Sequence, residues 1–461
     1  MSATFAPPIP PIPEHSLRRG AYLRALRTNT IATWPREAYE QLIRPATLLG
    51  RPSLLLNDPD AIHHVLVANP ETYRRTAAAI RVLRPVVGNG LLLAEGDAWR
   101  HQRRTLAPSF APRVMPMLCR HIARATAGWV TDLAARAEAG PVDLLAAMQG
   151  LTLEIAGRAL FSLETGAFRD EMRTMITAFG LTLARPYLLD LLLPLGVPSP
   201  RDLLRWRFKR RWMRLIDRIL AARLAMPAAS AETGNDARDL LDLMLAARDP
   251  ESGEAFDRTA LREQVATLIV AGHETTAVAL FWSLFLLATV PEEQERVAAE
   301  VAGLAITPEN AAAMLARMPR TRAVVSEALR LYPPAATLVR QATADDRIGA
   351  TAIPRGTVVF VAPWVLHRHR RLWREPDTFD PSRFLPDAPP PPRFAYLPFG
   401  AGPRICIGAQ FALAEAALVL GMLLQRFTLA RETEEPVLPV SVVTTHPDHP
   451  PGFRLRARPP N

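Results

Sequence analysis

Residues 399–408 read Phe399-Gly400-Ala401-Gly402-Pro403-Arg404-Ile405-Cys406-Ile407-Gly408 and form the most informative stretch of this 461-residue chain. Glycines at positions 400 and 402 permit backbone turns that a Cβ would hinder, so amide N–H groups can point back at a sulfur atom. A run of helix-forming composition, residues 409–425, follows directly. We therefore expect Cys406 at a helix N-terminus, where the helix dipole lowers the pKa of a thiol and favours the thiolate. A thiolate in this position suits metal ligation.

Other readings of this cysteine are less consistent with its surroundings. An inert buried cysteine is common, and that interpretation fits Cys119, which lies on the helical pattern 116–127. A zinc site needs about four close ligands, and a redox dithiol needs a second cysteine nearby. The sequence offers neither around Cys406. One thiolate without companion ligands favours an iron whose remaining positions are filled by a porphyrin.

The pattern Phe-x-x-Gly-x-Arg-x-Cys-x-Gly resembles the haem-binding signature of the cytochrome P-450 haem-thiolate monooxygenases. Three further elements occur in that family's order and extend the resemblance over about residues 99–452: Trp99-x-x-x-Arg103, Ala271-Gly272-His273-Glu274-Thr275-Thr276, and Glu327-x-x-Arg330 followed by Pro381-Ser382-Arg383-Phe384. The resemblance implies haem b (iron protoporphyrin IX) with Cys406 as its axial ligand, O2 as co-substrate, and NAD(P)H as an indirect electron source. It implies that these residues bind the cofactor: Trp99, Arg103, Ala271, Gly272, Arg340, Phe399, Gly400, Arg404, Cys406 and Gly408.

Helical periodicity dominates the chain and predicts a mainly α protein with small β-sheets, an α+β architecture. Together with the resemblance it indicates the cytochrome P-450 fold, as a single haem domain over residues 17–461 that follows a proline-rich segment, residues 1–16. The expected helices include 36–44, 99–106, 114–138, 143–160, 200–225 and a longest one at 258–289, ended by Pro291. Strands are expected at 53–57, 347–353 and 357–362, with a terminal hairpin at 441–456.

The longest expected helix carries the second motif. Thr267, Ala271 and Thr275 recur every four residues and so share one face. In the resembled family this helix crosses the distal haem face, and the Ala271-Gly272 pair opens its hydrogen-bond ladder beside the oxygen site. The resemblance then makes Thr275 the organiser of proton delivery and Glu274 a general acid. The alternatives are a threonine that caps its own helix and an exposed surface acid. His273 is expected to point away from the iron.

The family pattern also assigns supporting roles. It places Arg103, Arg340 and Arg404 at the haem propionates, because buried carboxylates need partners; ordinary surface charge remains the alternative for Arg103 and Arg340. Glu327 and Arg330 lie three residues apart on one helical face. By resemblance they pair with Arg383 in a buried triad that is structural. The stretch 367–373, His-Arg-His-Arg-Arg-Leu-Trp, departs from the family's usual His-Arg-Asp-Pro, which leaves the local turn open.

The predicted reaction is insertion of one atom of O2 into an apolar substrate, a fatty acid or a terpenoid-like compound. The expected substrate pocket consists of Ile80, Val82, Val86, Val87, Leu91, Thr267, Ala335, Ala336, Thr337 and Leu338. Two other functions remain in view. A non-catalytic haem-thiolate gas sensor or carrier has no use for the Glu274-Thr275 relay, and a peroxide-driven hydroxylase would be expected to carry an arginine beside Thr275.

The overall composition of the chain limits its possible binding partners and its cellular location. The net charge is +10, but the arginines are scattered without an aromatic-interleaved basic patch, which argues against nucleic acid. Residues 1–16 have the features of neither a signal peptide nor a membrane span, and the two cysteines fit a reducing cytoplasm. We expect a soluble, monomeric, cytoplasmic protein. Because no flavin or iron–sulfur module is recognised before Asn461, electrons are expected from a separate ferredoxin or flavodoxin with its reductase, docking near Arg100 and Arg104.

Overall fold

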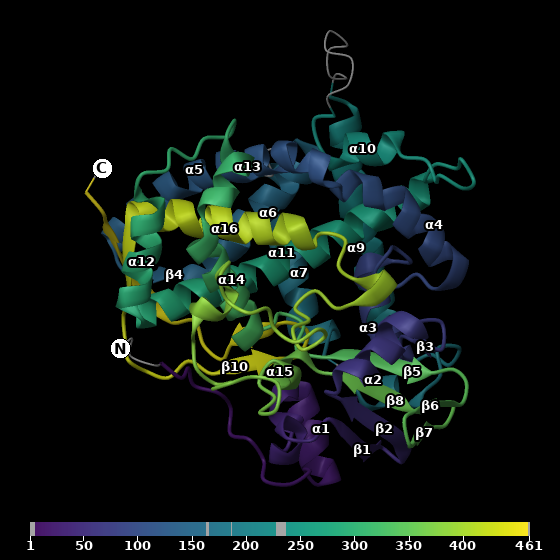
Figure 1. Ribbon diagram of the computed structural model, residues 1–461. Helices are drawn as coiled ribbons and strands as arrows, with labels where there is room; N and C mark the ends of the chain where they lie inside the picture. Colours follow the sequence, from purple (N-terminus) through teal and green to yellow (C-terminus); the bar gives the residue numbers. More distant parts are fainter. Residues whose placement is uncertain (1–4, 163–165, 186, 227–236, 460–461) are drawn as a thin grey trace.

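The computed structural model describes residues 5–162, 166–185, 187–226 and 237–459. In Figure 1 the longer helices are stacked on one side of the molecule, and most of the strands gather at the lower right. The α-helices are α1 (Arg19–Thr28), α2 (Pro59–His63), α3 (Ala77–Val87), α4 (Gly96–Leu106), α5 (Met115–Ala139), α6 (Leu144–Phe161), α7 (Gly166–Ala178), α8 (Leu188–Leu192), α9 (Asp202–Leu224), α10 (Leu240–Ala246), α11 (Arg258–Thr289), α12 (Pro291–Ala302), α13 (Ala311–Met314), α14 (Pro319–Leu331), α15 (Pro363–Leu366) and α16 (Ala409–Arg426). The mainly α architecture with small sheets is confirmed.

Helix α11 is the central element, and its bounds are those predicted from the sequence. Asp257 caps its first turn by accepting the N–H of Ala260 at 2.6 Å, and Pro291 opens the next helix one residue after the C-cap, Val290. All residues from 276 to 288 are buried. A helix that is buried on every side belongs to the core, and here it packs chiefly against α6 and α16.

Two helices, α6 and α11, are long and apolar enough to cross a membrane by length and composition alone. In both, most of the apolar window is buried inside the protein, 78% for α6 and 67% for α11. Burial of this kind is the usual property of core helices.

Four small sheets are present in the described residues. The strands are β1 (Ile43–Leu48), β2 (Arg51–Leu56), β3 (Tyr73–Arg74), β4 (Val142–Asp143), β5 (Leu338–Ala342), β6 (Asp346–Ile348), β7 (Thr351–Ile353), β8 (Val358–Val361), β9 (Phe427–Arg431), β10 (Pro439–Ser441), β11 (Thr445–Pro447) and β12 (Gly452–Ala457). The largest sheet has the order β1-β2-β8-β5-β3, with β2 and β8 parallel and the other pairs antiparallel. Arg340 lies on β5, and this sheet positions it at the site described below.

Three predicted elements differ from the structure. The stretch 347–353, expected as one strand, belongs to a hairpin of β6 and β7. The helix expected at 36–44 is a 3₁₀ turn, Arg36–Tyr39, followed by β1. Leu49 and Gly50 both have positive φ, 50° and 82°, and form the tight turn that joins β1 to β2. The hairpin expected at 441–456 is shorter: β10 pairs with β11, whereas β12 pairs with β9 and β4. The partners of β12 come from distant parts of the chain, which local pattern does not reveal.

The proline-rich N-terminal segment has no helix between residues 5 and 18. Phe5 forms a β-bridge with Phe379, whose N–H donates to the Phe5 carbonyl at 2.8 Å. Ile9 and Ile12 pack against the main hydrophobic core. The described part of this segment is therefore held against the body of the protein.

Candidate active site

The loop around Cys406 has the tight turns that its glycines predict. Gly400 and Gly402 have φ of 72° and 71°, and a Cβ on Gly402 would collide with the carbonyl oxygen of Leu66. The Cys406 N–H donates to the Phe399 carbonyl at 2.9 Å, which closes the loop. Among the described residues no group of three or more His, Cys, Asp or Glu side chains could hold a metal ion. Cys406 thus stands alone as a thiol ligand.

The ionisation expected for this thiol is corrected by the structure. Helix α16 begins at Ala409, three residues beyond Cys406. The thiol is accessible from the cavity, yet the surrounding protein desolvates it and raises its pKa. A hydrogen bond from the Gly408 N–H and the charge of Arg103 oppose that increase but do not outweigh it. The protein chain alone therefore does not favour the thiolate at Cys406. The same N–H and guanidinium are the groups that would stabilise a thiolate bound to iron.

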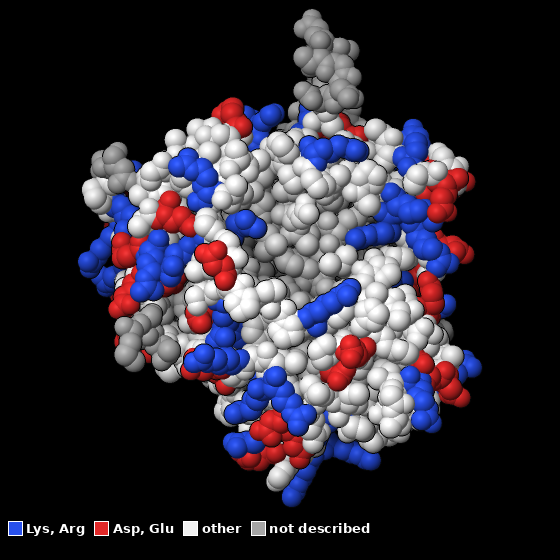
Figure 2. All heavy atoms as spheres, viewed as in Figure 1, with Lys and Arg blue, Asp and Glu red and all other residues white. Residues whose placement is uncertain are grey.

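A cavity of about 1020 Å³ lies between the Cys406 loop and α11. Figure 2 shows a hollowed area without charged side chains in the middle of one face, with acidic and basic residues interspersed around it. All the predicted cofactor and proton-delivery residues line the cavity: Trp99, Arg103, Ala271, Gly272, Glu274, Thr275, Arg340, Phe399, Gly400, Arg404, Cys406 and Gly408. Residues from four separate parts of the sequence therefore meet in one space.

Six of the ten predicted pocket residues lie in the cavity wall: Val86, Leu91, Thr267, Ala335, Thr337 and Leu338. The other four, Ile80, Val82, Val87 and Ala336, pack into the hydrophobic core. For Ile80, Val82 and Val87 the reason is helical geometry, because residues 77–87 form α3 and only one face of it, with Ala79, Leu83 and Val86, borders the cavity. Ala336, after α14, is buried in the main core.

Four arginines, Arg75, Arg103, Arg340 and Arg404, border one part of the cavity. Glu95 pairs with two of them, Arg75 at 3.2 Å and Arg404 more closely. In the described part of the chain, Arg103 and Arg340 have no ion pair with a carboxylate. Burial, with repulsion from Arg75, lowers the pKa of Arg340 and of Arg404 to about 10. The cluster therefore has an excess of positive charge.

This donor set fits haem. Two propionates would supply the missing negative charge, and Arg is suited to carboxylates because it can donate two parallel hydrogen bonds. Arg404 also lies over the Trp99 ring, 4.6 Å from its centroid, which fixes the indole beside the cluster. Arg103, Arg340 and Arg404 with Trp99 would hold the propionates, and Cys406 would hold the iron.

Helix α11 passes the cavity without interruption. The Thr275 hydroxyl donates to the carbonyl of Ala271 at 2.6 Å, and the backbone from Arg258 to Thr289 is continuous α-helix. The opening expected at Ala271-Gly272 is thus not seen, and Thr275 bonds to its own helix, the arrangement given above as its alternative. A Cβ on Gly272 would meet no atom within 4 Å, because the helix faces open space there.

Glu274 sits in a polar cluster at the cavity wall. One carboxylate oxygen, Oε1, lies 3.0 Å from Nε2 of His446 and accepts the side-chain N–H of Gln149 at 3.1 Å. His273 Nδ1 lies 3.4 Å from the other oxygen, Oε2. Burial alone would raise the pKa of the Glu274 carboxyl, but His273 and His446 hold it well below its usual range. Glu274 is not the exposed surface acid that was the alternative.

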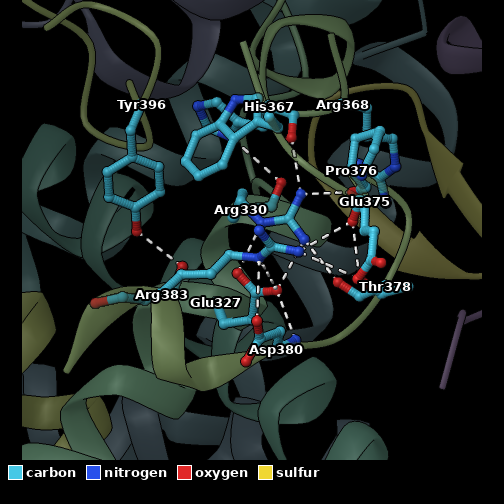
Figure 3. A network of polar contacts seen from close by, with 12 residues as sticks. Glu327, Arg330, His367, Arg368, Glu375, Pro376, Thr378, Asp380, Arg383 and Tyr396 are labelled. Carbon is cyan, nitrogen blue, oxygen red and sulfur yellow. Dashed lines mark hydrogen bonds and ion pairs between the residues drawn. The ribbon is translucent and has the colours of Figure 1, made fainter. Parts of the chain in front are cut away.

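Glu327, Arg330 and Arg383 come together as expected (Figure 3). Glu327 and Arg330 are fully buried and share two hydrogen bonds of 2.7 Å, while Arg383 lies 3.6 Å from Glu327. Arg330 also donates to the carbonyls of His367, Pro376 and Thr378 at 2.6–2.8 Å. The His367 ring in turn accepts the N–H of Leu397 at 2.8 Å. The triad thereby fixes the chain that leads to the Cys406 loop.

A family model described as cytochrome P450 matches residues 31–450. The chain belongs to the cytochrome P450 family. Cyclooctatin synthase of Streptomyces melanosporofaciens is 33% identical over 82% of this chain and 81% of the relative. Cyclooctat-9-en-7-ol 5-monooxygenase of the same organism is 31% identical over 80% and 79%. Cytochrome P450 97B2, chloroplastic, of Glycine max is 30% identical over 88% and 79%.

These similarities confirm the predicted family and enzyme class. The protein is a cytochrome P450 monooxygenase, an oxidoreductase that uses haem, O2 and electrons derived from NAD(P)H. Monooxygenases of this family act with redox partners and on apolar substrates as a rule.

Sequence reasoning missed several residues of this P450 site. Arg75 and Glu95 complete the arginine cluster, and Gln149 and His446 contact Glu274. Glu415, on α16, also lines the cavity; burial raises the pKa of its carboxyl well above the usual value, and its Oε1 has no hydrogen-bond partner. Only Glu415 had a sequence signal, as a lone acid in the apolar run 411–424.

The arginines expected to attract the redox partner are already paired. Arg100 contacts Asp97 and Glu71, at 2.6 and 2.7 Å. Arg104 contacts Asp249 and Glu251, both at 2.9 Å. Their charge is therefore largely compensated within the protein.

Proposed function

We propose that this P450 oxidises an apolar substrate of fatty-acid or terpenoid type. It would use haem b, and a separate ferredoxin or flavodoxin with its reductase would pass electrons from NAD(P)H. We further propose that it works as a monomer in the cytoplasm. The supporting relatives include one whose name states oxidation at position 5 of cyclooctat-9-en-7-ol.

The observation that carries the substrate class is the composition of the cavity beyond the arginine cluster. Leu83, Val86 and Leu91 border it from the α3 side, and Ala335 and Leu338 border it after α14. Apolar walls of this size favour a ligand that gains free energy by leaving water, about 25 cal/mol per Å² of apolar surface buried. A small polar metabolite would lose its hydration there without compensating partners.

The chain's residues divide the work of monooxygenation. When bound, haem would supply the activation of O2. The overall reaction consumes two electrons and two protons, places one oxygen atom in the substrate and releases the other as water. Arg103, Arg340 and Arg404 would hold the cofactor, and the apolar walls would exclude water and orient the substrate. Thr275 and Glu274 hold and pass the protons that must reach the same part of the cavity.

A spectral binding screen tests the substrate class. Purified P450 is titrated with a terpenoid alcohol, a medium-chain fatty acid and, as polar control, a disaccharide, while the haem absorption spectrum is followed. The apolar ligands should shift the spectrum. Ala335→Phe should weaken that response for the bulkier ligand most, because it fills the cavity wall. A response to the disaccharide but to neither apolar ligand would overturn the proposal and leave the haem assignment intact.

A further inference from the structure

A polar cluster lies where α11 meets the β10–β11 hairpin, in the otherwise apolar wall of the cavity. Its members are Glu274, Gln149 and His446, all of which line the cavity, with His273 behind them. His446 Nε2 lies 3.0 Å from Glu274 Oε1, and Gln149 donates to the same oxygen at 3.1 Å. The contact between Glu274 and His446 joins two elements that are remote in sequence.

The position of His446 is fixed by its neighbour. The carbonyl of Thr445 accepts the indole N–H of Trp282 at 2.7 Å, and the Thr445 hydroxyl donates to the Pro333 carbonyl at 2.7 Å. Thr445 is fully buried, and His446 pairs with Val440 across the hairpin. The imidazole is therefore held beside Glu274 by the core of the protein and not by a chance surface contact.

Thr444 gives the same ring nitrogen a second partner. Its hydroxyl oxygen lies 2.7 Å from His446 Nε2. A hydroxyl can both accept and donate, so it can accept a hydrogen bond while Nε2 carries a proton and donate one after that proton has left. Nε2 of His446 can thus keep a hydrogen bond to Thr444 whether or not it carries a proton. This arrangement suits the nitrogen to proton transfer.

We propose that His446 is the group that supplies protons to Glu274, and that the two form the proton inlet of the active site. The inference rests on the role proposed above for Glu274. In the step, the Nε2–H bond of the imidazolium breaks and an O–H bond forms at Glu274 Oε1; Glu274 passes the proton on towards Thr275, and water reprotonates His446. His446 acts only through Glu274, so it is a positioning and supplying residue.

Accessibility distinguishes His446 from the other nearby histidine. The side chain of His446 is 34% exposed, that of Glu274 17% and that of His273 3%. Both ring nitrogens of His273 lack a hydrogen-bond partner in the described structure. His446, which lines the cavity, is therefore the more accessible of the two rings.

The test compares His446→Gln with His446→Phe, His273→Gln and His449→Gln in the haem-loaded enzyme. Glutamine keeps a side-chain donor but cannot change charge near neutral pH, as an imidazole can. The titratable groups on the elements around His446 are Glu274 and His273 on α11 and Asp448 and His449 just beyond β11. Product formed per NAD(P)H, hydrogen peroxide released and the solvent isotope effect are measured from pH 5 to 8. Nitrogen NMR of labelled histidines in the reduced, carbon-monoxide-bound protein reports whether Nε2 of His446 is bonded to Glu274.

Both His446 variants should make product about 10²-fold more slowly, the lower end of a general acid's contribution, and should release more peroxide than the wild type. His449→Gln should behave as wild type, and the His446 Nε2 resonance should shift in Glu274→Gln. Wild-type coupling in His446→Gln would show that His446 provides only a structural hydrogen bond. Loss of coupling in His273→Gln but not in the His446 variants would identify His273 as the donor. Either result overturns the proposal. If Glu274→Gln itself leaves coupling unchanged, the role of Glu274 fails instead.

Discussion

Glu327→Ala should strongly destabilise this P450 without touching the site of oxidation. The carboxylate is fully buried and accepts two hydrogen bonds of 2.7 Å from Arg330 and one of 2.9 Å from the N–H of Asp380. Removing it leaves the Arg330 guanidinium buried without a counter-charge. The three carbonyls that Arg330 also contacts satisfy its hydrogen bonds but not its charge.

The size of the effect follows from that geometry. Breaking a buried ion pair by removing one partner costs about 3–5 kcal/mol, because a charge stays desolvated. A loss of about 4 kcal/mol changes the folding equilibrium about a thousandfold and removes much of a typical stability of 5–15 kcal/mol. Glu327→Gln should cost less, since the amide oxygen can still accept from Asp380.

Urea unfolding of the haem-loaded proteins, followed by far-ultraviolet circular dichroism, measures the free energy of unfolding, and haem content is measured in parallel. Glu171→Ala is the matched control: its partner Arg218 lies at 3.0 Å, but both side chains are about half exposed, so the loss should be about 0–1 kcal/mol. A haem-loaded Glu327→Ala protein within 1 kcal/mol of the wild type would refute the argument that this triad fixes the cysteine loop.

Three further outcomes are expected. Reduced protein under carbon monoxide should show the red-shifted Soret band of thiolate ligation. Cys406→Ser should abolish this band, and Cys119→Ser, a change in the buried core of α5, should leave it intact. A histidine-type spectrum in the wild type would contradict the ligand assignment. Thr275→Ala should divert electrons to hydrogen peroxide while haem content stays unchanged, and Thr275→Ser should restore coupling because it keeps the hydroxyl; unchanged product per NAD(P)H in Thr275→Ala would exclude the residue from proton delivery. Arg100 and Arg104 are already paired with carboxylates, so the rate of reduction by a ferredoxin should fall only modestly as the salt concentration rises. Stopped flow measures this rate. A steep fall with salt would show that other, unpaired cations attract the ferredoxin.

Much of the site was predictable because its residues lie in short, dense motifs. The turns at the glycines before Cys406 can be predicted from backbone conformation alone. The shared helix face of Thr267, Ala271 and Thr275 follows from their spacing of four residues. The bounds of α11 were predictable for the same reason, since an aspartate cap and a proline stop flank its apolar run.

The face of α3 that borders the cavity was not predictable in this way. Arg81 and Arg84 are the polar residues between positions 77 and 87, but Arg81 is buried and Arg84 is exposed, so these charges do not mark the solvent side of the helix; Pro85 also lies inside it. Ile80, Val82 and Val87 are as apolar as Leu83 and Val86, and only tertiary packing separates core from cavity wall. The pairing of His446 with Glu274 was hidden for a related reason, because it depends on how a C-terminal hairpin docks against a helix far away in the sequence.

The arginine cluster shows why this P450 chain should be more stable with its cofactor than without it. Arg340 is buried, and repulsion from Arg75 and Arg404 adds to the cost of keeping its charge out of water, which is what the lowered pKa expresses. Glu95 balances only part of this charge. The residues involved lie on or beside α4, β5 and the loop before Cys406, so repulsion among them pushes apart the elements that enclose the cavity. Haem propionates would convert this repulsion into attraction, and binding of haem to the folded state alone would then stabilise the fold by mass action. The same charges that select the cofactor thus oppose closure of the site until it arrives.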